Sequence, residues 1–201
     1  MTDKERLTRQ MDFCREVDKE KEVFRQSFLC SGNRRENDAE HAWHMALMAM
    51  VLQEYSNDDV DLLKVIEMLL IHDVVEIDAG DTYAYDAEGL KTQKEREDKA
   101  KERIFGLLPE DQKEMMISLF DEFEAFETPE SCFAHAMDNF QPFLLNDSND
   151  GGDWMEHGVS ISQVLGRQTQ SAKGSRELSD YVLEKLEEHV AKGHIKEDRK
   201  K

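Results

Sequence analysis

Apolar residues recur at intervals of three and four positions along most of the chain, which is the spacing of amphipathic helices. Only three prolines and few runs of β-branched residues interrupt this pattern, so we expect an all-α fold. Phe24–Phe28 is expected to form a short turn, followed by a loop over 31–36. The predicted helices cover residues 3–19, 38–55, 60–75, 88–106, 109–126, 128–145, 160–168 and 175–191.

Residues that cap or break helices set the predicted boundaries. Asn37, with Glu40 three residues later, matches the capping box that opens a helix. Turn-forming residues predict a loop over 80–83 and a surface loop over 146–152. The charged tail, 192–201, is expected to fray. Because no internal repeat or boundary is visible, residues 1–201 are expected to form a single domain.

The balance of charged and apolar residues narrows the class of protein. With 35% charged and 39% hydrophobic residues, the 201-residue chain can bury a sizeable core without disulfides. Its net charge of −19 argues against binding to a nucleic-acid backbone, because no basic face could displace the counterions. The same charge would repel an anionic substrate, so a site for one needs a local cation. A bound divalent metal is the first candidate.

The cysteines and the N-terminus indicate the compartment. Cys14, Cys30 and Cys132 lie far apart and form no CxxC pair, so reduced thiols are expected rather than a disulfide framework or a zinc knuckle. The charged N-terminus has no apolar signal segment behind it. No apolar run approaches the roughly 20 residues that cross a bilayer. The sequence therefore predicts a cytoplasmic protein with no membrane partner.

The segment Ile71–Asp81 carries the strongest candidate chemistry. His72 and Asp73 come at the end of an apolar helical run, where the helix dipole favours a cation. Burying this pair is costly unless something pairs with it, although a hydrogen-bonded His–Asp pair would suffice without a metal. Glu76 lies four residues after His72 and three after Asp73, on an adjoining helical face. Three titratable groups in one turn indicate a site.

Further candidates lie on two other predicted helices. His41 and His44 are three residues apart on an apolar helix, and spacing alone leaves the choice between them open. Asp138 lies among apolar residues, where an unpaired carboxylate would be unexpected. His135 is one turn before Asp138 and could approach the same ion or its substrate.

Together these residues resemble a known family. His41, His72-Asp73 and Asp138 match the H…HD…D signature of the HD-domain metal-dependent phosphohydrolases. The closer resemblance is to the branch of HD-domain 5′-deoxynucleotidases. It covers roughly residues 30–168 and rests on Arg35–His41, His72–Glu76 with Gly80-Asp81, Leu107–Asp111 and Trp154–Gly158.

The resemblance implies a compact helical HD domain, with a core over about 30–168 and C-terminal helices over 160–191. It implies one divalent ion (Mn, Co, Fe, Ni or Zn) held by His41, His72, Asp73 and Asp138, with His41 rather than His44 as the ligand. The expected catalytic residues are Asp73, Glu76 and Asp81, and the expected substrate-binding residues are Arg34, Arg35, Asp81 and His135. A homodimer and a small phosphorylated substrate are implied as well.

The expected function is metal-dependent hydrolysis of (deoxy)nucleoside 5′-monophosphates. The branch carries an Arg-Trp or Gly-Trp pair that Glu22–Phe28 lacks, so the selectivity for the sugar stays open. A (p)ppGpp-type pyrophosphohydrolase is a second reading, although its expected Asp after the Glu is Ile77 here. A di-iron HD oxygenase would need more histidines than His135 between Asp73 and Asp138. A non-catalytic metal-binding scaffold remains the alternative from another class.

Overall fold

The computed structural model describes residues 1–86 and 88–199, and most of them are helical, as the sequence predicted. The helices are α1 (Asp3–Glu16), α2 (Asp38–Leu52), α3 (Leu62–Ile71), α4 (Glu76–Ala79), α5 (Leu90–Phe105), α6 (Glu110–Ala125), α7 (Pro129–Ser148), α8 (Gly152–His157), α9 (Ile161–Ser171) and α10 (Arg176–Lys192). The 3₁₀ helices η1 (Val17–Glu22) and η2 (Gln53–Tyr55) and the strands β1 (Phe24–Phe28) and β2 (Arg35–Asn37) connect them. No helix in these two ranges has the length and apolar character needed to span a membrane.

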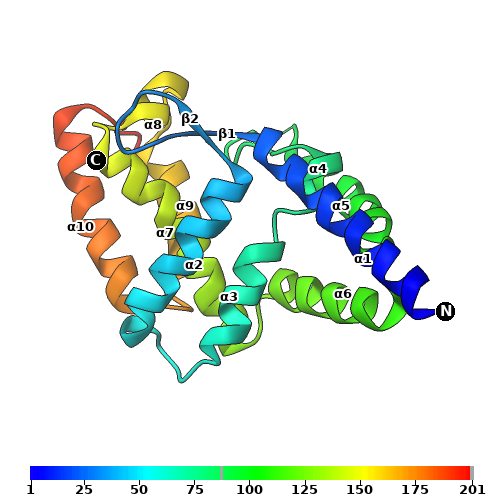
Figure 1. Cartoon of the computed structure of the whole chain (residues 1–201). Coiled ribbons are helices and arrows are strands. Elements are labelled where there is room, and N and C mark those ends of the chain that lie inside the picture. The colour runs from blue at the N-terminus through cyan, green and yellow to red at the C-terminus, as the bar shows by residue number, and fades with distance from the viewer. Residues whose placement is uncertain (87, 200–201) are drawn as a thin grey trace.

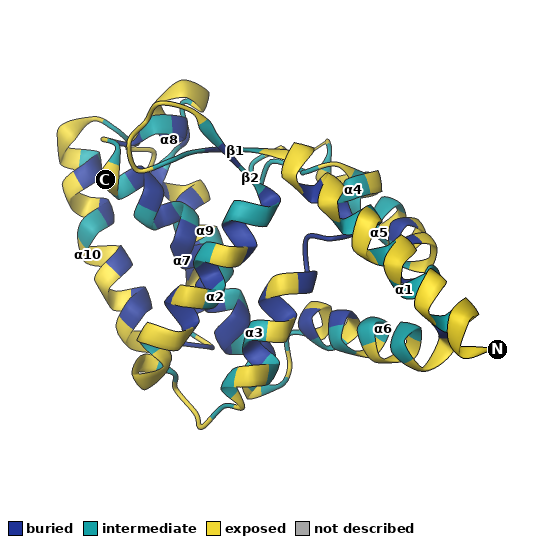
Figure 2. Ribbon diagram, in the orientation of Figure 1, coloured by how far each residue is buried: buried dark blue, intermediate teal, exposed yellow. Residues whose placement is uncertain are grey.

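Helix α7 forms the centre of the bundle and contacts α2, α3, α6, α9 and α10. Figure 1 shows α7 and α9 between α10 on one side and α2 on the other. Phe133, Met137 and Phe140 form one buried stripe of α7, and Ala134 and Leu145 are buried on other faces. A helix that is buried on several faces belongs to the interior. Helix α1 has no buried residue and lies at the exposed edge of the molecule (Figure 2).

Two clusters of buried apolar side chains meet at the segment that carries His72 and Asp73. Leu69 belongs to the larger cluster, among α2, α3, α7, α9 and α10. Ile71 and Val74 belong to the smaller one, which α5 and α6 complete. The chain thus crosses from one core to the other at the histidine–aspartate pair, and both residues are buried there.

The turn predicted at Phe24–Phe28 was wrong, because these residues form strand β1 of a β-hairpin. The loop predicted over 31–36 is confirmed for residues 31–34, and β2 begins at Arg35. Strands β1 and β2 pair antiparallel, with Phe24 opposite Asn37 and Phe28 opposite Arg35. Each strand is too short for its alternation to stand out from the helical pattern around it. The hairpin passes over the end of α2 and brings Arg25 to the interior.

The predicted helix over 60–75 is also interrupted. Helix α3 ends at Ile71, His72 is its C-cap, and the chain turns before α4 begins at Glu76. The backbone N–H of Glu76 donates to the carbonyl of Asp73 at 2.8 Å, which is the spacing of a tight turn rather than an α-helix. Gly80 follows α4 with φ +74°, a conformation that favours glycine and directs the chain into the next loop.

Two predictions near the C-terminus were wrong in part. The loop expected over 146–152 is confined to a turn at residues 149–151, because α7 continues to Ser148 and α8 begins at Gly152, and Asn146 is buried. The tail is packed rather than frayed where it is described, because Ile195 is buried and Lys196 forms a parallel bridge with Ser160. Residues 200–201 of the predicted tail lie outside the described residues. The capping box of Asn37 and Glu40 is confirmed.

Candidate metal centre and active site

Two histidines and two aspartates from separate elements converge where the two cores meet. His41 lies near the start of α2, His72 and Asp73 at the end of α3, and Asp138 in the middle of α7. Nε2 of His41 is 3.2 Å from Oδ1 of Asp138 and 3.9 Å from Oδ2 of Asp73. Nε2 of His72 is 3.1 Å from Oδ2 of Asp73 and 3.9 Å from Oδ1 of Asp138. The four side chains therefore face one point.

Hydrogen bonds behind each ring direct both Nε2 atoms into this cluster. Nδ1 of His72 donates to the carbonyl oxygen of Leu69 at 3.0 Å, so Nε2 carries the lone pair of the neutral ring. Nδ1 of His41 donates to Oε1 of Gln141 at 2.9 Å. Nε2 of Gln141 donates to Oε2 of Glu36 at 2.8 Å, which fixes the orientation of the amide. Histidines that bind metals are commonly held in this way through the second nitrogen.

Burial and neighbouring charges set the protonation of the cluster. Burial and the positive charge of Arg25 lower the pKa of His41 to about 4, so this ring is neutral at pH 7. Burial also acts to lower the pKa of His72, but the carboxylates of Asp73 and Asp138 outweigh it and raise this pKa to about 9. Although burial opposes it, the nearby imidazole and guanidinium groups hold the pKa of Asp73 and of Asp138 well below the usual range.

The donor set fits a divalent metal ion. His41, His72 and Asp73 each offer a ligand atom within 4.8 Å of the others. Nε2 of His72 is buried and faces the carboxylates of Asp73 and Asp138 at 3.1 Å and 3.9 Å, so a ligand atom from each lies close enough to share one ion. Two imidazole nitrogens with carboxylate oxygens suit Mn²⁺, Co²⁺, Fe²⁺, Ni²⁺ or Zn²⁺.

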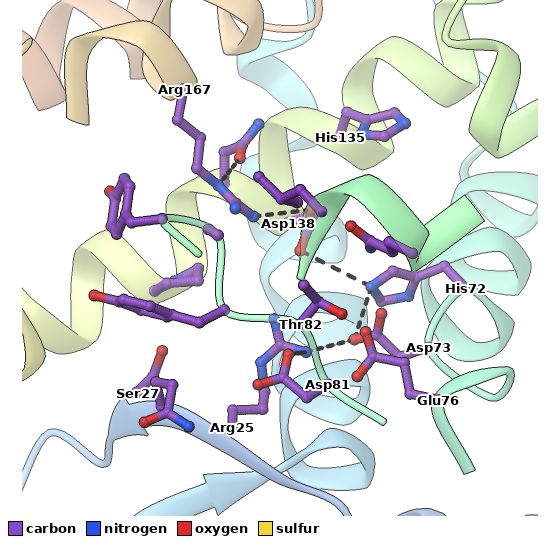
Figure 3. Close-up of a pocket in the computed structure, with 18 of the residues that line it drawn as sticks. Arg25, Ser27, His72, Asp73, Glu76, Asp81, Thr82, His135, Asp138 and Arg167 are labelled. Carbon is purple, nitrogen blue, oxygen red and sulfur yellow. Dashed lines mark hydrogen bonds and ion pairs between the residues drawn. The ribbon is translucent and has the colours of Figure 1, made fainter. Parts of the chain in front are cut away.

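Three of the four residues, His72, Asp73 and Asp138, line a pocket of about 250 Å³, whereas His41 is fully buried and is not part of the lining. Figure 3 shows Asp73, Glu76 and Asp81 near His72, with Arg25 rising from the strand below and Arg167 on the opposite side. The pocket also has an aromatic part. Its lining there includes Tyr85, Phe143, Trp154 and Val164. A charged region and an aromatic region thus share one cavity, as a phosphorylated ligand with an apolar group requires.

The HD domain family profile matches residues 17–179. The chain belongs to the HD domain family. The human 5′-deoxynucleotidase HDDC2 is 29% identical over 135 residues, a match that covers 67% of this chain and 65% of the human protein. The mouse 5′-deoxynucleotidase HDDC2 is 30% identical over 109 residues, which are 54% of this chain and 53% of the mouse protein. The chain thus spans less than two thirds of the curated relatives that it matches.

Two solved structures resemble this HD domain. A predicted metal-dependent phosphohydrolase from Magnetospirillum magnetotacticum MS-1 is 45% identical, with a TM-score of 0.90 over 94% of this chain and 95% of that chain. A conserved hypothetical protein from Pyrococcus furiosus is 23% identical, with a TM-score of 0.56 over 90% of this chain and 99% of that chain. The second likeness concerns the fold alone.

Among the other predicted site residues of the HD domain, Glu76 and Asp81 line the pocket. Burial and the charge of Asp73 raise the pKa of Glu76 well above its ordinary value. Burial likewise raises the pKa of Asp81. His135 lines the pocket too, but its ring stacks on Phe123 and its Nε2 bonds the Phe123 carbonyl at 2.9 Å.

The remaining predicted residues lie outside the pocket lining. Arg34 pairs with Glu40 at 2.7 Å on the surface. Arg35 pairs with Glu156 at 3.0 Å and covers the ring of Phe28. Their proposed role in binding substrate stays an untested prediction, and their contacts give no support to it. His44 contacts Gln141 through Nδ1 at 3.1 Å rather than the His72 cluster.

Sequence reasoning missed Gln141, Asp38 and Arg167, and it considered Arg25 only as a substitute, with Phe24, for the Arg-Trp pair of the deoxynucleotidase branch. Gln141 is three residues after Asp138, and this helical spacing could have indicated it. Arg25 and Asp38 lie in or beside the unpredicted hairpin. Arg167 is on α9, and no local pattern distinguishes it from the other surface arginines.

Proposed function

We propose that this HD domain protein is a metal-dependent phosphomonoester hydrolase that acts on (deoxy)nucleoside 5′-monophosphates. The observation that carries the proposal is the convergence of both Nε2 atoms with Asp73 and Asp138. His72, Asp73 and Asp138 line a pocket that also has aromatic walls. The similarity to the solved phosphohydrolase and to the 5′-deoxynucleotidases supports the same reaction.

We assign His41, His72, Asp73 and Asp138 to hold one divalent ion. Such an ion, when bound, supplies a Lewis acid for a phosphoryl oxygen and makes water a better nucleophile. Leu69 and Gln141 keep the imidazole rings in place through their Nδ1 atoms. Both Nε2 atoms therefore already face the proposed ion position, and neither ring has to turn when the ion binds.

Glu76 is the candidate for proton transfer. Its carboxyl group is buried, and its Oε2 has no hydrogen-bond partner in the part of the chain that the structure describes. Burial and Asp73 raise its pKa, so it can hold a proton near neutral pH. The protonated group could donate to the leaving oxygen of a phosphoester. Asp81, on the loop after α4, is the candidate for contact with the sugar or with water.

Arg167 is the candidate for binding the phosphate. Its guanidinium is 32% exposed and lines the pocket, with Nη2 3.6 Å from Oδ2 of Asp138. Its Nε donates to Oδ1 of Asn139 at 2.5 Å, which holds the group beside the proposed metal centre. A guanidinium there offsets the negative charge that this acidic protein would otherwise present to the phosphate. Tyr85, Phe143 and Trp154 offer the nucleoside an aromatic surface.

The test is phosphate release from deoxy- and ribonucleoside 5′-monophosphates with Mn²⁺ or Co²⁺. The Asp73→Ala variant is compared with Asp12→Ala, whose carboxylate is exposed and pairs with Arg15 far from the pocket. We expect turnover that Asp73→Ala abolishes and Asp12→Ala preserves. The ratio of deoxy to ribo turnover measures the selectivity for the sugar.

Two other outcomes would redirect the assignment. Preferential turnover of ppGpp would favour the pyrophosphohydrolase reading. Metal binding without turnover of any substrate in the panel would contradict the hydrolase proposal and favour a metal-stabilised scaffold.

We further propose a homodimer that forms through α2 and α3. Trp43, Leu47 and Met50 are 62%, 42% and 56% exposed, and their spacing places them on one face of α2. Leu63 and Leu70 of α3 are also exposed. Several exposed large apolar side chains on two neighbouring helices are typical of an interface. Phe120 and Phe123, the other stripe considered from the sequence, belong to the core.

Light scattering on a sizing column tests the dimer. We expect a dimer for the native chain and a monomer for Trp43→Glu, and a native monomer would overturn the proposal.

A cytoplasmic location is proposed from the cysteines, all of which are free in the described structure, and cell fractionation tests it.

A further inference from the structure

A second group of carboxylates lies beside the proposed metal centre and shares one residue with it. Asp38, Asp73 and Glu76 each offer an oxygen within 4.8 Å of the others, and all three are buried. Oδ2 of Asp38 and Oε2 of Glu76 find no hydrogen-bond partner among residues 1–86 and 88–199. Buried carboxylate oxygens without partners favour a cation, and Asp73 could bridge two of them.

Arg25 already supplies a positive charge to this second group. Its Nη1 is 2.7 Å from Oδ2 of Asp73, 3.2 Å from Oδ1 of Asp38 and 3.9 Å from Oδ1 of Asp81. The side chain is only 11% exposed, so water screens these contacts little. Figure 3 shows the guanidinium between the strand and Asp73, with Asp81 beside it.

The hairpin keeps Arg25 in this position. Phe24, the residue before it, is opposite Asn37, and the backbone N–H of Asp38 donates to the carbonyl of Val23 at 3.1 Å. The register of β1 against β2 therefore fixes Arg25 beside Asp38. A guanidinium held by its own strand cannot leave the site as a hydrated ion can.

We propose that Arg25 is the built-in second cation of this centre and restricts it to one metal ion. Its guanidinium contacts Asp73 and Asp38. A second divalent ion held by Asp38, Asp73 and Glu76 would need the same space. Two cations at such a distance in a buried site repel strongly. Removing the guanidinium takes away the positive charge that faces Asp38, Asp73 and Glu76 on the side away from the first ion, and a second ion then replaces this charge. The inference rests on the proposed function in that the first ion occupies the His41–His72–Asp73–Asp138 site.

The experiment counts Mn²⁺ ions per chain by equilibrium dialysis and elemental analysis. The native protein is compared with Arg25→Met, which keeps the apolar stem, and Arg25→Lys, which keeps the charge. We expect one ion in the native protein, two in Arg25→Met and one in Arg25→Lys. Paramagnetic resonance should show coupling between the two Mn²⁺ ions of Arg25→Met, since carboxylate-bridged pairs lie about 3.5–4 Å apart. Arg25→Gln serves as the second uncharged variant if Arg25→Met does not fold.

Asp138→Ala separates this inference from the proposed function. Asp138 is a ligand of the first site alone, so Arg25→Met/Asp138→Ala should keep one ion, held by the second group. If the native protein binds no ion but Arg25→Met binds one, the proposed metal centre fails and the role of Arg25 stands. One ion in folded Arg25→Met and in Arg25→Gln, or two ions in the native protein, would overturn the role of Arg25.

Discussion

The side-chain oxygen of Gln141 lies 2.9 Å from Nδ1 of His41, across a separation of 100 residues. The same amide donates to Glu36 from its nitrogen, so the oxygen is the end that faces the ring. Both groups are fully buried. This contact sets the tautomer of His41 and directs its Nε2 toward Asp138.

Gln141→Leu should therefore weaken metal binding without removing a ligand. Loss of such a support for a metal-bound histidine commonly costs about 10–100-fold in affinity. Titration with Mn²⁺ measures the dissociation constant. Gln10→Leu is the matched control, because the amide of Gln10 bonds Gln112 between α1 and α6, remote from the cluster. An unchanged dissociation constant in Gln141→Leu would show that the ring needs no such support.

Metal affinity should rise with pH between about 6.5 and 9. Without metal, the carboxylates of Asp73 and Asp138 raise the pKa of His72 to about 9, above its ordinary 6.5, so binding must displace a proton. Affinity is expected to increase about tenfold per pH unit and then level off. The same shift stabilises the metal-free fold fully below pH 6.5, and this stabilisation is lost as the pH rises through 9. Calorimetry in buffers of different ionisation enthalpy should detect the released proton; its absence at pH 7 would refute the prediction.

Glu20→Gln should stabilise the metal-free protein at alkaline pH. Burial and the charges of Asp73 and Asp38 raise the pKa of Glu20 to about 7, so the fold favours the protonated form. The native chain therefore loses stability as the pH rises from about 4.5 to 7, and the variant does not. We expect a gain on the order of 2 kcal/mol at pH 8 and little at pH 5, measured by urea unfolding in EDTA. Exposed Glu22→Gln is the control, and an equal effect at both pH values would argue against a buried carboxyl.

Arg167→Ala should raise KM far more than it changes the number of metal ions bound. Loss of a charged hydrogen bond to phosphate costs about 1.5–3 kcal/mol, or roughly 10–100-fold. Steady-state kinetics and metal analysis measure both quantities, with exposed Arg15→Ala as the control. Arg35→Ala tests the prediction made from the sequence. A larger rise in KM for Arg35→Ala than for Arg167→Ala would show that Arg35, and not Arg167, binds the phosphate.

Ile195→Ala should destabilise the fold although the residue lies in a predicted charged tail. The side chain is 2% exposed within the larger core cluster, and such truncations cost about 2–5 kcal/mol. Thermal and urea unfolding measure the loss. Leu183→Ala on α10, 39% exposed in the native chain, should cost much less. Equal losses in the two variants would mean that the tail contributes no core contact.

The helical class, most helix ends and the candidate residues His72, Asp73 and Asp138 could be inferred from the sequence. The choice of His41 over His44 came from the family resemblance alone, and the roles of these residues stay predictions. Helical periodicity and capping are local, as the confirmed capping box of Asn37 and Glu40 illustrates. Charged residues in apolar stretches are also recognisable locally, because burying them unpaired is costly. The break at His72 escaped prediction, since the apolar run continues through Val75 and only packing against two separate cores ends α3 at Ile71.

The tertiary structure alone decided which polar groups meet. Arg25 and Asp73 are 48 residues apart, and neither the short strand β1 nor its register could be read from the apolar pattern. The sequence offered Arg34 and Arg35 for the phosphate, whereas the fold turns both to other partners and brings Arg167 to the pocket. The sequence by itself thus determined most of the helices and which side chains are costly to bury. Only the packing of distant elements determined the partner of each buried charge, because that depends on distances in space.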